Sequence, residues 1–174
     1  MRSLRDLFLR LPANGNVRDA IRKFNLSPKV NGKAKSVKEL AETLGFSVER
    51  RKLPGGQAGR LVQDPFSDNG YCIEVNEAHS VESQRWSVLH EMGHFFLHAN
   101  HNDPLAEPLY LDRSNSAFYV DTRQETEANQ FAAVLLFGDG ALGAAIGLHG
   151  RDTKRLSRHF GVSEKTIRVA MKQF

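Results

Sequence analysis

Residues 85–98 read Arg85-Trp86-Ser87-Val88-Leu89-His90-Glu91-Met92-Gly93-His94-Phe95-Phe96-Leu97-His98. Apolar side chains recur along this stretch and no proline interrupts it, which predicts a helix over residues 80–99. His90 and His94 are four residues apart and therefore share one helix face, where two imidazoles can hold one Zn²⁺. Glu91 can serve as general base on a water activated by the metal. The same pattern would also suit a structural helix whose histidines only make hydrogen bonds, so the position of a third ligand decides between the two.

His98 continues the four-residue spacing of the motif histidines. Each such step climbs about 6 Å along a straight helix, so the imidazoles of His90, His94 and His98 cannot converge on one ion. The residues between His94 and His98 include no glycine that could turn the chain back. We therefore expect His98 beside the site or at the helix end, and not on the metal.

A carboxylate on a second buried helix, predicted over residues 122–137, can complete the site, as in zinc enzymes with two histidines and one glutamate. Thr122-Arg123-Gln124-Glu125 resembles a capping box, in which Glu125 bonds back to the start of the helix. Glu127 has no such role and falls on an apolar face with Phe131, where a carboxylate without a cation would be costly. We predict Glu127 as the third ligand and retain Glu125 as the alternative.

The remaining sequence predicts several short helices and strands around these two helices. Helices are expected at 3–10, 16–25, 37–44, 152–160 and 163–174, strands at 46–50, 59–62 and 71–76, and a glycine-rich joint after residue 137. We predict an α+β, zincin-like core with a small mixed or antiparallel sheet packed on the motif helix. The predicted parts are a basic N-terminal helical extension (1–35), the core (36–137) and a helix-turn-helix-like C-terminal subdomain packed on it (138–174).

The composition of the chain excludes several classes of protein to which it could otherwise belong. The chain has 174 residues and one cysteine, Cys72, which excludes an internal disulfide and any zinc site built on several cysteines. The N-terminal residues carry frequent charges and lack the apolar segment of a signal peptide. No run approaches the roughly 18 apolar residues that a transmembrane helix needs. These features predict a cytoplasmic protein without a membrane partner.

Charge is unevenly distributed around a net value of +4. Residues 1–62 hold 14 Lys and Arg against 5 Asp and Glu, residues 63–127 hold 3 against 12, and residues 150–174 hold 7 against 2. The basic tail contains a helix-Gly-helix pattern, with Gly161 between the helices and Ser163 as the second cap, which is typical of a helix-turn-helix. Direct DNA binding is therefore an alternative, although two short helices packed on the core explain the same pattern.

The paired motifs resemble the ImmA/IrrE family of metallopeptidases. The resemblance is carried by residues 86–98, by Glu127-Ala128-Asn129-Gln130-Phe131-Ala132-Ala133-Val134-Leu135-Leu136, and by Ile73-Glu74-Val75-Asn76 upstream. It implies one catalytic Zn²⁺ held by His90, His94 and Glu127, with Glu91 as catalytic base. Phe137-Gly138 departs from the Met-Pro that the family often has at this point.

The resemblance further implies a protease that cleaves a helix-turn-helix repressor and so relieves repression, in a phage, mobile-element, stress-response or toxin–antitoxin module. Peptide hydrolysis also needs an oxyanion donor besides the metal. His98, Tyr110, Tyr119 and His149 are the candidates for that role or for supporting the ligands. The alternative function is a DNA-binding or repressor-binding regulator in which zinc is structural and no turnover occurs.

Overall fold

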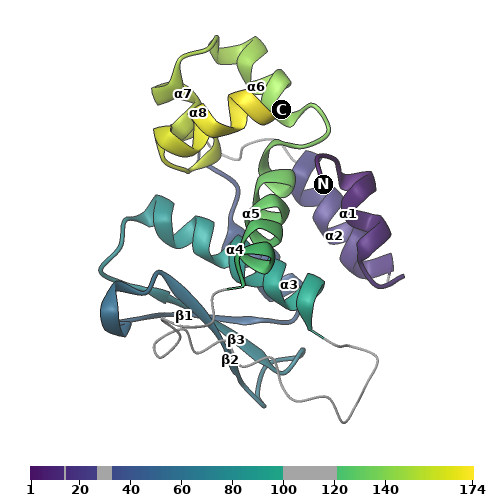
Figure 1. The fold of residues 1–174 in the computed structure, drawn as a ribbon, viewed down its shortest axis with the longest axis vertical. Helices are drawn as coiled ribbons and strands as arrows, with labels where there is room; N and C mark the ends of the chain where they lie inside the picture. Colours follow the sequence, from purple (N-terminus) through teal and green to yellow (C-terminus); the bar gives the residue numbers. More distant parts are fainter. Residues whose placement is uncertain (14, 27–32, 100–120) are drawn as a thin grey trace.

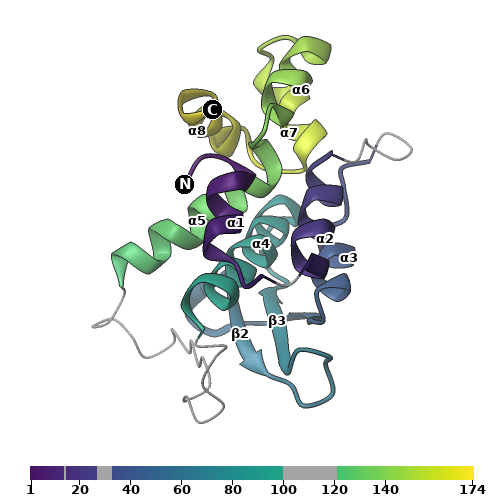
Figure 2. The ribbon, with the colours of Figure 1, turned by 90° about the vertical axis from the view of Figure 1, so that its right-hand side faces the viewer.

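A computed structural model of the chain describes residues 1–13, 15–26, 33–99 and 121–174. The molecule is built in layers, with a small sheet at one end, helix α4 across it, and helix α5 packed on α4 (Figure 1). Helices α1 and α2 cover the other side of α5, and α6, α7 and α8 gather beyond its C-terminal end (Figure 2). This arrangement confirms the predicted α+β class with a small sheet against the motif helix.

The element bounds follow the sequence pattern closely. The helices are α1 (Leu4–Arg10), α2 (Gly15–Leu26), α3 (Val37–Thr43), α4 (Val81–His98), α5 (Thr122–Phe137), α6 (Ala141–His149), α7 (Thr153–Phe160) and α8 (Glu164–Gln173). The strands are β1 (Ser47–Arg51), β2 (Gly59–Gln63) and β3 (Tyr71–Asn76), with a short 3-10 turn η1 (Pro54–Gly56) between the first two. The glycine-rich joint was predicted wrongly, because most of it forms α6.

The sheet is mixed, with strand order β1-β3-β2. The central strand β3 pairs in parallel with β1 and antiparallel with β2. Five of the six residues of β3 are buried, which agrees with its place in the middle of the sheet and against α4. One face of the sheet therefore packs against the motif helix α4.

Helix α4 is buried on all sides along its middle. Its first turn is capped by Ser80, whose hydroxyl accepts the backbone N–H of Ser83 at 3.2 Å. Every residue from Ser87 to Phe96 is buried, because the sheet, α3 and α5 cover different faces of the helix. Burial all round explains why the apolar pattern of α4 is not confined to one stripe.

Gly93 permits the close approach of α4 and α5. A Cβ atom at this position would lie 2.9 Å from the Cα of Ala128 and 3.1 Å from its carbonyl oxygen. These are backbone atoms of the facing helix, which cannot swing away as a flexible side chain could. The spacing between α4 and α5 thus depends on the absence of a side chain at Gly93.

Helices α1 and α2 are fastened to the C-terminal end of α5. The backbone N–H of Leu4 donates to Asp139 Oδ2 at 2.6 Å. The buried amide of Asn25 donates to the carbonyl oxygens of Leu135 and Gly138 at 3.1 and 3.2 Å, which satisfies groups that a helix end leaves unpaired. The N-terminal residues are therefore an integral part of the packed structure.

The C-terminal helices are docked on the core through α4. Arg85 donates from Nε to the carbonyl oxygen of Gly161 at 2.9 Å and from Nη2 to that of Phe160 at 3.1 Å. Gly161 adopts a left-handed conformation (φ 66°) and ends α7, as predicted, and Ser163 caps α8. The rings of Phe137 and Phe160 meet edge to face at 4.9 Å. The turn between α7 and α8 thus lies against the core.

Within the described residues, no single helix is long and apolar enough to cross a membrane; α5 and α6 reach the required length and composition only as a pair, which is bent by 51°.

Candidate metal centre

Three potential metal-binding side chains converge where α4 faces the first turns of α5. Nε2 of His90 and Nε2 of His94 lie 3.0 Å apart. Each lies 3.2 Å from an oxygen of the Glu125 carboxylate. A tetrahedral ion with ligand distances of about 2.0–2.1 Å separates its ligand atoms by roughly 3.3 Å. The three side chains therefore have the spacing of a zinc ligand set.

Asn129 determines the tautomer of His90. The indole Nε1–H of Trp86 can only donate, and it lies 3.2 Å from Asn129 Oδ1. The same oxygen lies 3.0 Å from Nδ1 of His90 and can only accept from it. The proton of a neutral His90 is therefore on Nδ1, and Nε2 presents a lone pair toward His94 and Glu125.

His98 supports His94 in the corresponding way. The Nδ1 atoms of the two rings lie 3.2 Å apart, and Nε2 of His98 lies 3.1 Å from Glu127 Oε2. Burial lowers the pKa of His98, which favours the neutral form of this ring. A single direction of donation satisfies every atom: His94 Nδ1–H donates to His98 Nδ1, and His98 Nε2–H donates to Glu127. Nε2 of His94 is then also left with a lone pair.

These tautomers make the centre a site for a cation. The Nε2 lone pairs of the two imidazoles and the carboxylate of Glu125 face one another at 3.0–3.2 Å. The proton of each imidazole is on Nδ1, on the opposite side of the ring. Such an arrangement of acceptors is repulsive unless they share a positive charge. Neutral imidazoles and carboxylates are common ligands of zinc in proteins. The residues present thus fit a divalent metal.

Glu125, and not Glu127, lies beside the two histidines, which differs from the sequence-based prediction. The main cause is the start of α5. Asp121 is the N-cap, and its carboxylate accepts the backbone N–H groups of Arg123 and Gln124 at 2.9 and 3.2 Å. Thr122 is therefore the first helical residue and forms no capping box with Glu125. The carboxylate of Glu125 instead lies against α4, beside His90 and His94.

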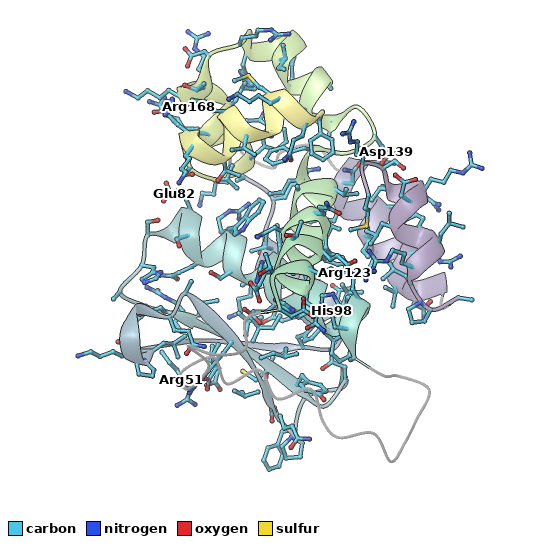
Figure 3. All side chains as sticks on the ribbon, in the orientation of Figure 1. Arg51, Glu82, His98, Arg123, Asp139 and Arg168 are labelled. Atoms are coloured by element: carbon cyan, nitrogen blue, oxygen red, sulfur yellow. The ribbon has the colours of Figure 1, made fainter. Side chains whose placement is uncertain are left out.

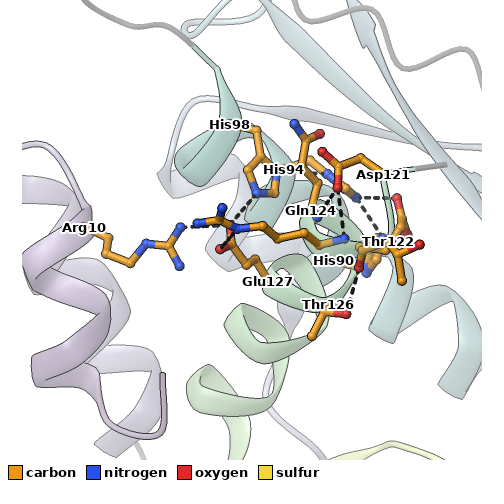
Figure 4. A network of polar contacts seen from close by, with 11 residues as sticks. Arg10, His90, His94, His98, Asp121, Thr122, Gln124, Thr126 and Glu127 are labelled. Atoms are coloured by element: carbon orange, nitrogen blue, oxygen red, sulfur yellow. Dashed lines mark hydrogen bonds and ion pairs between the residues drawn. The ribbon is translucent and has the colours of Figure 1, made fainter. Parts of the chain in front are cut away.

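Glu127 points away from the histidine pair and toward α1 (Figure 4). Its Oε2 accepts from Nη2 of Arg10 at 2.8 Å, and this hydrogen bond holds the pKa of Glu127 at about 2. The sequence predicted that a metal balances this carboxylate; in the structure the guanidinium of Arg10 pairs with it. The residue that supplies it is more than 110 positions away in the sequence, and no local pattern indicates it.

Glu91 lines the same cleft as His90 and Glu125. A cavity of about 490 Å³ opens between residues 54–59, which connect β1 with β2, and the facing sides of α4 and α5. His90, Glu91, Glu125 and Asn129 all line it. Glu91 itself is only 1% exposed, so its carboxylate is presented to this cleft from within the protein.

The remaining predicted residues are placed as follows. His98 sits at the end of α4 near Arg123, whereas Asp139 marks the far end of α5 (Figure 3). His149 lies in α6, beyond that far end, with Nε2 3.0 Å from Nδ1 of His159, so it is not an oxyanion donor for this centre. Tyr110 and Tyr119 lie outside the described residues. Asn129 and Arg10 contribute contacts that the sequence analysis missed, although Asn129 stands inside the E-A-N segment.

Comparison with known proteins shows the family of the chain. The family model Peptidase M78, described as the IrrE N-terminal-like domain, matches residues 41–172. The protein "Metallopeptidase ImmA" of Bacillus subtilis (strain 168) is 28% identical over 108 residues, which is 62% of this chain. The aligned segment spans 59% of the length of that relative. Because the family model covers most of the chain and both helices of the metal centre, the chain belongs to the IrrE N-terminal-like domain family of peptidases, as the ImmA/IrrE resemblance predicted.

Proposed function

We propose that this protein is a metal-dependent endopeptidase whose centre is formed by α4 and α5. The observation that carries the proposal is the convergence of His90, His94 and Glu125 at the cleft that His90, Glu125 and Glu91 line. Membership of a peptidase family and similarity to a protein named a metallopeptidase support it. Three ligands and an adjacent buried carboxylate are the parts that metal-assisted hydrolysis requires.

The ligands we propose are His90 and His94 through Nε2 and Glu125 through its carboxylate. Zinc is the metal we propose, since two imidazoles and one carboxylate leave a fourth position open in a tetrahedral site. When bound, such a metal polarises the scissile carbonyl and lowers the pKa of water toward about 7. Asn129 and His98 hold the two imidazoles with their Nε2 atoms facing inward.

Glu91 is proposed as the general base. Its place directly after His90 on α4 puts its carboxylate at the cleft wall beside the ligand set. From there it can take a proton from water and pass it to the leaving amine. Burial keeps bulk water from competing for that proton, because Glu91 is almost completely enclosed.

The substrate we propose is a helix-turn-helix repressor, which the protein would cleave in the cytoplasm to relieve repression. Support comes from the family resemblance and from the cleft, whose walls are formed by the residue 54–59 loop on one side and Trp86 on the other. The loop has two glycines with positive φ, Gly55 and Gly56. A bare backbone of this kind allows a peptide main chain to approach closely.

A DNA-binding regulator without turnover is the competing function. The shape of α7 and α8 favours it, since they form a helix-turn-helix with seven Lys and Arg over residues 150–174. Against it, Lys165, Thr166 and Val169 of α8 line a cavity shared with α4 and α5, so this face of the second helix looks toward the core. We therefore assign the tail to packing on the peptidase. Salt-dependent binding of the intact protein to duplex DNA would reverse that assignment.

The proposed function is tested by metal analysis and cleavage assays with the wild-type protein and Glu91→Gln. We expect about one zinc per chain in both proteins. Turnover of a helix-turn-helix repressor that the wild type cleaves should fall by about 10²–10⁴-fold in Glu91→Gln, because the amide cannot accept the proton.

The control for this experiment is Glu82→Gln, an exposed substitution in the first turn of the same helix, which should leave both measurements unchanged. Normal cleavage by Glu91→Gln would exclude the proposed base. A wild-type protein that binds the repressor without cutting it would favour the regulator instead.

A further inference from the structure

We infer that helix α1 is part of the metal centre, with Arg10 as a positioning residue for the ligand His94. The inference rests on the proposed ligand set and adds to it a connection that begins outside the segment matched by the family, residues 41–172. Arg10 does not approach the donor atoms. It acts on them through Glu127 and His98, both of which touch their neighbours directly.

A continuous series of hydrogen bonds connects Arg10 of α1 with His94 (Figure 4). Arg10 Nη2 lies 2.8 Å from Glu127 Oε2, the same oxygen lies 3.1 Å from His98 Nε2, and the Nδ1 atoms of His98 and His94 are 3.2 Å apart. The exposed fraction of the side chain falls along this series, from 38% at Arg10 and 16% at Glu127 to 6% at His98 and 1% at His94. A partly exposed cation is thus connected to a fully buried ligand.

In each hydrogen bond of this series, the donor and the acceptor can be assigned. A guanidinium can only donate and an ionised carboxylate can only accept, so Arg10 and His98 both donate to Glu127. A neutral His98 then accepts at Nδ1, and His94 donates from its own Nδ1. This leaves Nε2 of His94 unprotonated and aimed at His90 and Glu125. An outer carboxylate that fixes a ligand histidine in this way also raises its basicity.

Arg10 is the cation that fixes the oxygen His98 uses. Arg123 also pairs with Glu127, but through Oε1 at 3.3 Å, and its side chain is 85% exposed. Arg10 is closer and shares Oε2 with the histidine. Without Arg10, the carboxylate can rotate toward Arg123 and water, and His98 loses the acceptor that sets its tautomer.

The backbone of α1 is held firmly enough for Arg10 to act as a positioning group. Leu7 and Leu11 are buried in the core on either side of it. At the C-terminal end of α1, Arg18 of α2 donates to the carbonyl oxygens of Phe8 and Leu11 at 2.7 and 3.3 Å. At its other end, Leu4 bonds to Asp139. The helix therefore spans α5 from its C-terminal end to the metal centre.

We expect Arg10→Ala to weaken Zn²⁺ binding about tenfold and His98→Phe up to about 100-fold, the range typical of groups that orient a ligand. Affinity is measured by competition with a chelator. Arg10→Lys keeps the charge and one donor, so it should restore part of the affinity. Arg5→Ala, on the exposed side of the same helix, is the matched control and should bind zinc like the wild type.

A double-mutant cycle tests whether Arg10 acts through Glu127. Glu127→Gln alone should weaken zinc binding, and adding Arg10→Ala to it should cause little further loss. In the metal-free protein, ¹⁵N NMR of the imidazoles should show His94 protonated at Nδ1 and His98 at Nε2. The Arg10→Ala variant should shift His98 toward a mixture of tautomers, an effect that a purely structural role would not produce.

Unchanged zinc affinity and unchanged His98 tautomer in Arg10→Ala would overturn the inference, while normal cleavage by the wild type would leave the proposed function standing. Additive losses in the double mutant would show that Arg10 acts by another route, and would also overturn it. If the wild type bound no metal, the proposed function and this inference would both fall. Thermal unfolding of each metal-free variant separates loss of the fold from loss of the site.

Discussion

Replacing Glu125 by alanine is expected to lower the affinity for Zn²⁺ by more than 100-fold and to abolish peptidase activity. The carboxylate lies 3.2 Å from Nε2 of both His90 and His94, so its removal leaves only two of the three proposed ligands. The loss should exceed the roughly 10–100-fold effect of removing a group that only orients a ligand. Metal content after dialysis against a mild chelator, followed by titration with Zn²⁺, measures the difference.

The informative comparison is with Glu127→Ala, two residues along the same helix. That carboxylate accepts from Arg10 and His98 and does not face the histidine pair, so its removal should weaken binding by about 10–100-fold. Glu125→Gln, which preserves size, should still bind zinc far more weakly than the wild type. A greater loss in Glu127→Ala than in Glu125→Ala would reverse the assignment and restore the ligand set predicted from the sequence.

Replacing Gly93 by alanine is expected to lower the free energy of unfolding by about 1–3 kcal/mol, the usual cost of inserting a methyl group into a packed core. The added Cβ would lie 2.9 Å from Cα and 3.1 Å from the carbonyl oxygen of Ala128, so α4 and α5 would have to separate. Because His90 and His94 flank this position and Glu125 lies across from it, zinc affinity should fall as well. Urea denaturation of the metal-free protein measures the first effect and chelator competition the second.

Gly143→Ala provides a control with the opposite expected sign. Gly143 is also helical, but nothing lies within 4 Å of the Cβ that it would gain, and the residue is exposed. Alanine at such a position should stabilise the protein by about 0.5–1 kcal/mol through its better helix propensity. Equal effects at both positions would mean that helix propensity, and not the close approach of α4 and α5, governs Gly93.

The sequence was sufficient for the local structure of the motif helix. The spacing of His90 and His94 fixes their common face whatever surrounds them, because a helix repeats every 3.6 residues. Ser80 before the helix and Gly161 and Ser163 in the tail mark ends that the structure confirms, since caps and left-handed glycines act over a few residues. The strands at 47–51, 59–63 and 71–76 were also predicted within a residue or so.

The sequence pattern did not predict the first residue of α5 correctly, because two neighbouring residues, Asp121 and Thr122, can both act as an N-cap. Taking Thr122 as the cap of α5 assigned Glu125 to a structural role, whereas Asp121 performs that role in the structure. Helix α6 was missed because its three-dimensional packing, through Leu142 and Ala145, outweighs the low helix propensity of Gly143 and Gly147. Neither error could be corrected from periodicity alone, because α5 is buried on nearly every face over its last turns.

By itself, the sequence determined that two histidines and a glutamate share a helix, that a second, buried helix with two glutamates follows, and that the paired motifs resemble a peptidase family. Only the tertiary structure decided which glutamate meets the histidines and which meets a cation from elsewhere. The physical reason is that side chains on one helix are ordered by a fixed repeat, whereas the partner of a carboxylate depends on packing between distant segments. Arg10 and Glu127 are 117 positions apart and become neighbours only when α1 packs on α5.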